Sequence, residues 1–299
     1  MLTAVSGPRE HRRAVGAGTA VGWLLGGPRR CGGVRTAGGH HPCPYEAVIE
    51  PGGKASQCAS CQGADPGLAL ARDQILDDGR TYRLYLAWFG AGVLKVGLTA
   101  EQRGTARLLE QGALGYTFVA RGSLPGVRRA ELTVAQAGLA RERLSSRTKS
   151  ARWWGLPEPS ARQRELAELR RSVLRLLTGH AIELLPDGEA DGAPDGEADG
   201  EADGRTVDQV GLFGLADGAP PLYREVTAFS DGATLSGVLR PPVGRHLFLD
   251  TAPDEPPLLL DTRLLTGWTL TPAAGAPCAG LELALRRRPE DVGAQEPLF

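Results

Sequence analysis

The stretch 82-YRLYLAWFGAGVLKVGLTAEQRGTARLLEQGA-113 has the pattern of a β-hairpin followed by a helix. Apolar residues occupy both alternating sets of positions in 82–89, which is typical of a strand buried on both faces. A short glycine turn, Gly90-Ala91-Gly92, separates it from a second strand at 93–98. A helix is predicted to follow at 101–111. These elements begin an α/β domain.

The same domain continues with one more strand and two helices. Residues 114–121 predict the third strand, and Pro125 is suited to the first turn of a helix that extends to about Leu144. A further helix is predicted from Ser160, which has the spacing of a capping box with Gln163. The predicted order is therefore ββαβαα over residues 80–180.

Residues on this frame resemble the GIY-YIG nuclease module. Leu84-Tyr85 stands on the first strand where that family has Ile-Tyr, and Lys95-Val96-Gly97 stands on the second where it has Tyr-Ile-Gly. Two positions depart from the family pattern. Lys95 replaces the second tyrosine, and Gln111 stands where the family often has a histidine.

The resemblance implies a phosphodiester-cleaving site. A metal and a guanidinium would stabilise the charge on the phosphate oxygens. On this basis Glu131 would hold Mg²⁺ or Mn²⁺, and Arg103 is an alternative to Arg107 as the phosphate-binding arginine. The predicted catalytic residues are Tyr85, Lys95, Arg107 and Glu131, and the predicted substrate-binding residues are Gly97, Thr99, Arg103 and Gln111. Without that chemistry, Tyr85 would be a half-buried strand aromatic, and Arg107 and Glu131 a structural ion pair.

Four of the five cysteines gather in a Gly- and Pro-rich segment and form the pattern C-x₁₁-C-x₁₄-C-x₂-C. Four thiolates fill a tetrahedral Zn²⁺ shell, and a closed shell stabilises a segment that has no core. An odd cysteine count disfavours disulfides, and a redox C-x-x-C normally opens a helix after a strand. Structural zinc is therefore predicted at Cys31, Cys43, Cys58 and Cys61, with His40 or His41 as a replacement ligand.

The fifth cysteine and the C-terminal part belong to a different environment. Six short apolar runs between residues 223 and 285 are separated by Gly, Pro and Asp turns, which is typical of a small barrel or sandwich. Cys278 lies among these runs and is predicted to be a buried small hydrophobe.

Charge is unevenly distributed along the chain. Residues 1–186 hold 26 Lys/Arg and 15 Asp/Glu, a balance of +11, whereas the repeat at 187–204 holds 8 acidic residues and no basic ones. Residues 205–299 hold 8 basic and 12 acidic residues, which brings the total to −1. A basic part favours polyanionic partners, although solvated arginines in an Arg-rich sequence are an equal alternative.

The fold class predicted from these patterns is α+β. The chain divides into a start at 1–20 that is disordered or an over-long gene start, a zinc-knuckle-like segment at 21–65, the GIY-YIG-like domain at 80–180, an acidic disordered linker at 187–204 and a β-rich domain at 205–288. The linker follows from its composition, which buries too little apolar surface to offset ordering entropy.

A second resemblance covers most of the chain. A cysteine-rich start, 95-KVGLT-99, Arg107 with 111-QGA-113, a downstream Glu131 and the tail trace 261-DTRLLTGW-268 are similar to an uncharacterised bacterial family of unknown function. It implies the domain plan and no activity.

The sequence thus predicts a nucleic-acid-engaging zinc protein and a candidate metal-dependent nuclease. Non-catalytic nucleic-acid binding, or a protein-interaction scaffold on the same fold, is the alternative. No stretch is long and apolar enough to span a bilayer, so we expect a cytoplasmic protein with no membrane partner.

Overall fold

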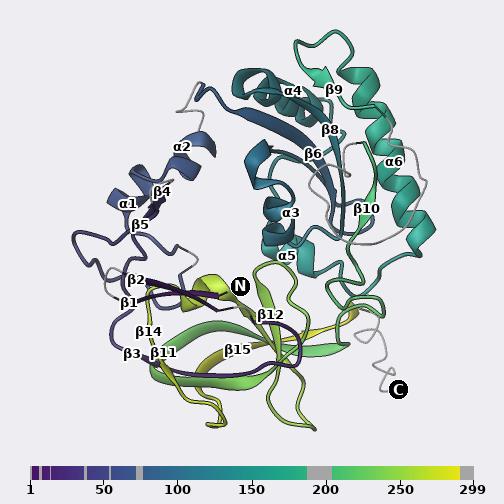
Figure 1. Cartoon of the computed structure of the whole chain (residues 1–299). Coiled ribbons are helices and arrows are strands. Elements are labelled where there is room, and N and C mark those ends of the chain that lie inside the picture. The colour runs from purple at the N-terminus through teal and green to yellow at the C-terminus, as the bar shows by residue number, and fades with distance from the viewer. Residues whose placement is uncertain are drawn as a thin grey trace, which may run out of the picture. The chain divides into compact units, whose positions relative to one another are not determined.

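The computed structural model describes residues 2–6, 9–13, 15–36, 39–53, 55–71, 77–186 and 204–289. The chain has a mixed α+β architecture with several sheets and divides into two compact units. We call Leu76–Ala219 the α/β unit, and Met1–Ile75 with Pro220–Phe299 the β-rich unit. Figure 1 shows the elements of both. The predicted linker lies outside the described residues except for Gly204.

The α/β unit is built on one antiparallel sheet of order β10-β8-β6-β7, with β9 also paired to β8. Its strands are β6 (Thr81–Trp88), β7 (Leu94–Ala100), β8 (Gly115–Ser123), β9 (Glu183–Leu184) and β10 (Val207–Asp208). Its helices are η1 (Glu101–Arg103), α3 (Ala106–Gln111), α4 (Leu124–Gln136), α5 (Ser146–Ser150) and α6 (Pro159–Leu176). The hairpin, third strand and long helices lie where the sequence predicts them.

Helices cover both faces of this sheet. Leu108 of α3 packs in one cluster with Tyr85 on the first face, whereas α4 and α6 lie on the other face, beside Gly122 and Gly115 of β8. Trp88 at the end of β6 donates its indole N–H to Glu165 of α6 at 2.7 Å, and the same carboxylate accepts the N–H of Gly92 at 2.9 Å. Glu165 therefore holds α6 against the β6–β7 turn. Covered faces explain why both alternating residue sets of β6 are buried.

One predicted helix boundary and one predicted helix cap are wrong. The helix expected to reach Leu144 ends at Gln136, because Gly138 turns the chain with a left-handed φ of 73°. The helix expected from Ser160 begins at Pro159, with Glu158 as its N-cap. The fixed φ of proline suits this first position better than the proposed capping box.

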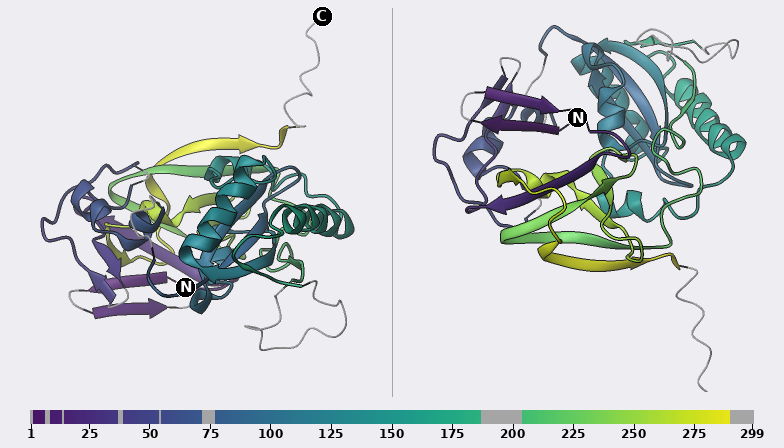
Figure 2. Two further views of the ribbon diagram at one scale, coloured as in Figure 1. Left: turned by 90° about the horizontal axis from the view of Figure 1, so that it is seen from above. Right: turned by 60° about the horizontal axis from the view of Figure 1, so that its bottom comes forward.

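The β-rich unit is dominated by the 18-residue strand β11 (Leu222–Leu239), which covers two runs that the sequence predicted as separate strands. The other strands are β3 (Ala20–Gly26), β12 (His246–Asp250), β13 (Leu258–Asp261), β14 (Thr269–Pro272) and β15 (Ala279–Arg287), with the short helix η2 (Thr262–Leu265) after β13. Because β13 pairs with the start of β11 and β12 pairs with its end, the sheet curls into a half-barrel. Figure 2 shows β3, β11 and β15 running together.

The N-terminal segment contributes to this sheet. In β3, Val21 and Leu25 are buried in the same apolar cluster as Leu235 and Leu260. The rest of the segment forms β4 (Val34–Thr36), β5 (Gly39–His41), α1 (Ala59–Gly63) and α2 (Pro66–Ala71). β1 (Leu2–Ser6) and β2 (Arg9–Arg13) pair as an antiparallel hairpin, whereas the sequence predicts no ordered element there. Backbone pairing of this kind leaves no mark in composition.

No helix in the described part of the chain combines the length and the apolar character needed to cross a bilayer.

Candidate functional site

The four predicted zinc ligands come together in the β-rich unit. Their Sγ atoms all lie within 4.8 Å of one another, and those of Cys43 and Cys58 are 3.9 Å apart. A tetrahedron with Zn–S bonds of about 2.3 Å has edges of about 3.8 Å, so the spacing fits a metal ion such as zinc. Cys31 follows β3, Cys43 follows β5, and Cys58 and Cys61 lie at the start of α1. This group can hold a metal ion.

Backbone N–H groups and burial act on these thiols in opposite directions. Hydrogen bonds from backbone N–H groups, that of Ala47 first, lower the pKa of Cys43 to about 7. Burial raises the pKa of Cys31 and of Cys61. The N–H of Cys58 also points at the Cys31 sulfur, at 3.2 Å. Donors of this kind favour thiolates, which are the form that binds metal.

The other candidate ligands lie apart from this group in the described structure. His40 Nε2 is 2.6 Å from the carbonyl oxygen of Gly32, and His41 Nε2 is 3.0 Å from Thr36 Oγ1. Cys278 is half-buried rather than buried, and its thiol donates to the Ser236 carbonyl at 3.3 Å. The ligand set is therefore four cysteines without a histidine.

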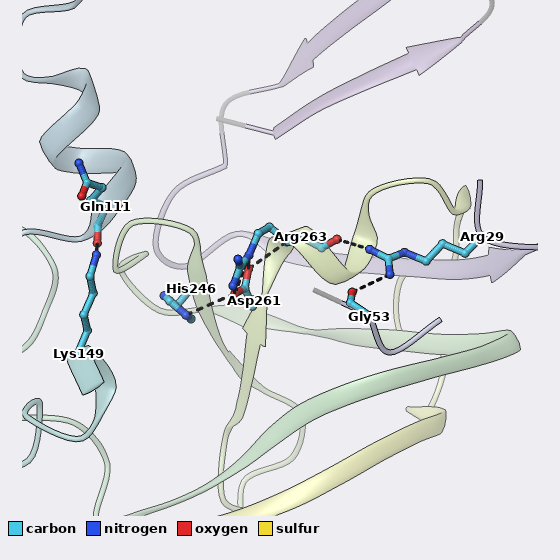
Figure 3. A network of polar contacts seen from close by, with 7 residues as sticks. All are labelled: Arg29, Gly53, Gln111, Lys149, His246, Asp261 and Arg263. Carbon is cyan, nitrogen blue, oxygen red and sulfur yellow. Dashed lines mark hydrogen bonds and ion pairs between the residues drawn. The ribbon is translucent and has the colours of Figure 1, made fainter. Parts of the chain in front are cut away.

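Arg29 joins the cysteine segment to the half-barrel, and sequence reasoning missed it. Its side chain is 1% exposed, and Figure 3 shows it between the carbonyls of Gly53 and Arg263. The guanidinium donates to backbone oxygens from both parts: Glu50 (2.6 Å), Gly53 (2.8 Å), Arg263 (2.8 Å) and Thr266 (2.9 Å). Nothing in the sequence separates Arg29 from the neighbouring Arg30.

The α/β unit brings together a second set of predicted residues around β6 and β7. Tyr85 pairs directly with Gly97, and a Cβ added at Gly97 would lie 2.3 Å from the Tyr85 hydroxyl oxygen and 2.9 Å from Lys95 Nζ. Gln111 at the end of α3 donates its amide to that hydroxyl at 2.8 Å. The Lys95 ammonium lies 5.4 Å from the centroid of the Tyr85 ring. Tyr85 is only 1% exposed, so its ring and hydroxyl group contact Gln111, Lys95 and Gly97 from within the core.

Glu131 lies on α4 with its side chain 7% exposed. It is in contact with Arg128, whose Nη1 also bonds Glu142 Oε1 at 2.8 Å. Burial raises the pKa of Glu131, while the Arg128 hydrogen bond and charge, and then the charge of Lys95, act in the opposite direction. Its carboxylate is therefore already neutralised by protein cations.

The remaining predicted residues lie apart from this cluster. Arg103 and Arg107 are about half-exposed, and both pair with Glu110, at 2.7 and 3.8 Å. Thr99 is buried, and its hydroxyl contacts the neighbouring Ala100 carbonyl at 3.5 Å. Tyr85, Lys95, Gly97 and Gln111 are thus in direct contact, and Glu131 is linked to them through the charge of Lys95.

Two further cations lie at this site and were not among the predicted site residues. The buried ammonium of Lys149, on α5, donates to the Gln111 carbonyl at 3.0 Å (Figure 3). It also lies 3.9 Å from the centroid of the Phe89 ring. Arg128 stands three residues before Glu131 on one helix. That spacing alone predicts an ion pair and was available in the sequence.

An arginine-rich segment borders the same cluster. Arg141 runs beside β7, where its carbonyl accepts the N–H of Val96 and its N–H donates to Leu94, both at 3.0 Å. From there the chain leads through Arg143, Arg147 and Arg152, which are all exposed, as is Arg141. We call residues 141–152 the basic segment.

A family model described as "Protein of unknown function (DUF2797)" matches residues 76–270.

The chain belongs to the DUF2797 family. This confirms the predicted membership of a family of unknown function, although the match begins after the cysteine segment rather than near residue 21. The DUF2797 region, residues 76–270, contains the basic segment and the four residues in contact around β6 and β7, which are Tyr85, Lys95, Gly97 and Gln111. Comparisons with curated proteins and with solved structures found no match.

Proposed function

We propose that this DUF2797 protein binds nucleic acid through the phosphate backbone, and that its four-cysteine cluster holds a structural zinc ion. The observation that carries the proposal is the basic segment beside Lys95. Arg141, Arg147 and Arg152 are exposed and form no ion pair with any described residue. Phosphate neutralisation by such side chains is the main sequence-independent source of affinity for nucleic acid.

The charge of the surrounding unit supports the same partner. Residues 76–186 hold 18 Lys/Arg and 10 Asp/Glu, which leaves a balance of +8. The only acidic residue of the basic segment is Glu142, and it is bonded to Arg128. Arg141, Arg147 and Arg152 are therefore not balanced by an acidic neighbour within the described part of the segment.

The resemblance of 82–113 to the GIY-YIG module supports a phosphodiester as the bound group. Two observations limit the proposal to binding. Tyr85 is buried, and Glu131 is already paired with Arg128. The test must therefore also distinguish two other functions. One is cleavage of nucleic acid with Mg²⁺ or Mn²⁺, and the other is a protein-interaction scaffold that binds no nucleic acid.

The test uses the full, zinc-replete chain with labelled single-stranded, duplex and branched DNA and RNA, with and without Mn²⁺. Arg141→Gln with Arg147→Gln is compared with Arg164→Gln with Arg171→Gln. All four arginines are exposed and form no ion pair within the described structure, and the second pair lies on α6, across the sheet. Both double variants remove the same charge.

We expect the first double variant to bind more weakly and to lower the slope of log K against log salt by one to two units, as about 0.9 per lost phosphate contact predicts. The α6 variant should bind as the wild type does. Equal loss in both variants would contradict the assigned surface. If no nucleic acid is retarded in any condition, the protein is a scaffold that does not bind nucleic acid. If Mn²⁺ produces cleaved nucleic acid, the protein is a nuclease.

A further inference from the structure

The carboxylate that the nuclease resemblance assigns to a divalent ion is already engaged. Arg128 contacts Glu131 and also bonds Glu142, so one guanidinium holds both acidic side chains of this region. Glu131 is buried, and a metal ion on its carboxylate would have to displace Arg128 from this contact. Breaking a buried ion pair is costly because the remaining charge is uncompensated.

Lys95 stands where the GIY-YIG module, which this stretch resembles, has its second tyrosine, and its ammonium occupies the space beside Gly97. The Lys95 Nζ and the Tyr85 hydroxyl lie 2.9 and 2.3 Å from the same point, the position of a Cβ atom on Gly97. The ammonium is also near the Tyr85 ring, at 5.4 Å. Gly97 therefore leaves room for both groups, and the ring of the buried Tyr85 contacts the Lys95 ammonium and restricts its position.

The Lys95 ammonium has unused hydrogen-bonding capacity. It has three N–H donors. One donates to the Val96 carbonyl at 3.0 Å, and no further hydrogen bond of Lys95 is formed within the described residues. Its side chain is only half-buried, and Arg141 pairs with it through the backbone. Two donors and a full positive charge can therefore face a ligand at the start of the basic segment.

We propose that Lys95 is the phosphate-binding residue of this site, that it takes the phosphodiester without a divalent metal, and that Glu131 serves as the counter-ion of Arg128. The inference rests on the proposed nucleic-acid binding and identifies the group that receives the phosphate. An ammonium is a compact point charge suited to a phosphate oxygen. The protein itself thus supplies the cation that would otherwise come from a metal ion.

The experiment measures the affinity of the full chain for labelled single-stranded DNA and RNA in buffer freed of Mg²⁺ and Mn²⁺. Strong chelators are avoided because they would strip the cysteine cluster, and zinc content is checked by elemental analysis. Lys95→Met removes the charge at similar length, Lys95→Arg keeps it, and Arg171→Met on α6 is the matched control. A parallel titration follows Mn²⁺ binding to the wild type and to Glu131→Gln.

We expect unchanged affinity with and without Mn²⁺, about tenfold weaker binding for Lys95→Met, and near wild-type binding for Lys95→Arg and Arg171→Met. Mn²⁺ bound by the wild type and lost in Glu131→Gln would overturn the inference. Binding that requires Mn²⁺ and survives Lys95→Met would also overturn it, while leaving the proposed function in place. Absence of nucleic-acid binding in every condition would overturn both.

Discussion

Gly97 lies directly opposite Tyr85 in the β6–β7 pair, and any Cβ atom at Gly97 would lie 2.3 Å from the tyrosine hydroxyl oxygen. The ring of Tyr85 therefore crosses the neighbouring strand at the one position without a side chain. This contact also fixes the place of Lys95, whose ammonium would be 2.9 Å from the same Cβ. A glycine is needed here for space rather than for backbone freedom.

Gly97→Ala should therefore destabilise the α/β unit by about 1–3 kcal/mol, because the added methyl group must displace a buried aromatic ring. Urea unfolding measures the change. Gly155→Ala is the matched control, since no atom lies within 4 Å of a Cβ there and its φ is ordinary. Equal stability of the two variants would show that Tyr85 does not pack across Gly97.

The buried Arg29 leads to a second prediction. Arg29→Met should lower the free energy of unfolding by about 2–4 kcal/mol, because several buried carbonyls lose a charged donor. The neighbouring Arg30 serves as the control. It is half-exposed and pairs with Glu46 at 3.3 Å, so Arg30→Met should cost less than about 1 kcal/mol.

Arg29→Lys sharpens this test. Lysine keeps the charge but lacks the planar fork that reaches carbonyls of both the cysteine segment and the half-barrel. We expect it to recover little of the lost stability in thermal or urea unfolding. Full recovery would mean that charge, and not the geometry of the guanidinium, joins the two parts.

The sequence predicted what depends on local pattern. The hairpin, the third strand and α6 follow from apolar periodicity and turn residues, and the cysteine spacing indicated the cluster. The pairing of β3 with β11 joins positions some 200 residues apart in the chain and has no local signal. The two predicted strands of β11 are one because the chain continues through Ser230–Gly232, which composition marks as a turn.

The site was predicted to a similar extent. Strand alternation places Tyr85, Lys95 and Gly97 on one face, so their contact was accessible to sequence reasoning. The burial of Tyr85 and the pairing of Glu131 with Arg128 depend on how α3 and α4 cover the sheet. Those tertiary contacts have no local signal in the sequence.

The cysteine cluster predicts a metal-dependent stability. The purified protein should contain about one zinc ion per chain, and Cys61→Ser should lose it, because a missing thiolate opens the closed tetrahedral shell. Elemental analysis measures the zinc, and thermal unfolding measures the stability. Cys278→Ser is the control, because Cys278 lies outside the cluster. Zinc retained in Cys61→Ser would contradict this ligand set.

His246 predicts how stability changes with pH. It is 7% exposed, and burial lowers its pKa from 6.5 to about 4, against the favourable charge of Asp261, which lies 3.8 Å away (Figure 3). Between these values the unfolded chain takes up a proton that the folded chain does not, so the folded state loses stability as pH falls. The full loss from this group is about 3 kcal/mol.

Neighbouring charges set the edges of that window. Arg245 and Arg263 further disfavour protonation of His246. Burial opposes ionisation of Asp261, yet the Arg263 hydrogen bond and the charges of His246 and Arg263 hold its pKa below the usual value of 3.8. The contribution of Asp261 is therefore present above that value and is lost only at lower pH.

Urea unfolding at a series of pH values from 7 to 4.5 tests whether stability falls with pH and whether His246 is the cause. His246→Gln should remove much of the fall in stability over this range, because no imidazole remains to take up a proton on unfolding. His180→Gln, in the α/β unit, should keep the wild-type slope. If His246→Gln and the wild type lose stability in parallel, the neutral buried state of His246 is wrong and another group controls the acid side of the profile.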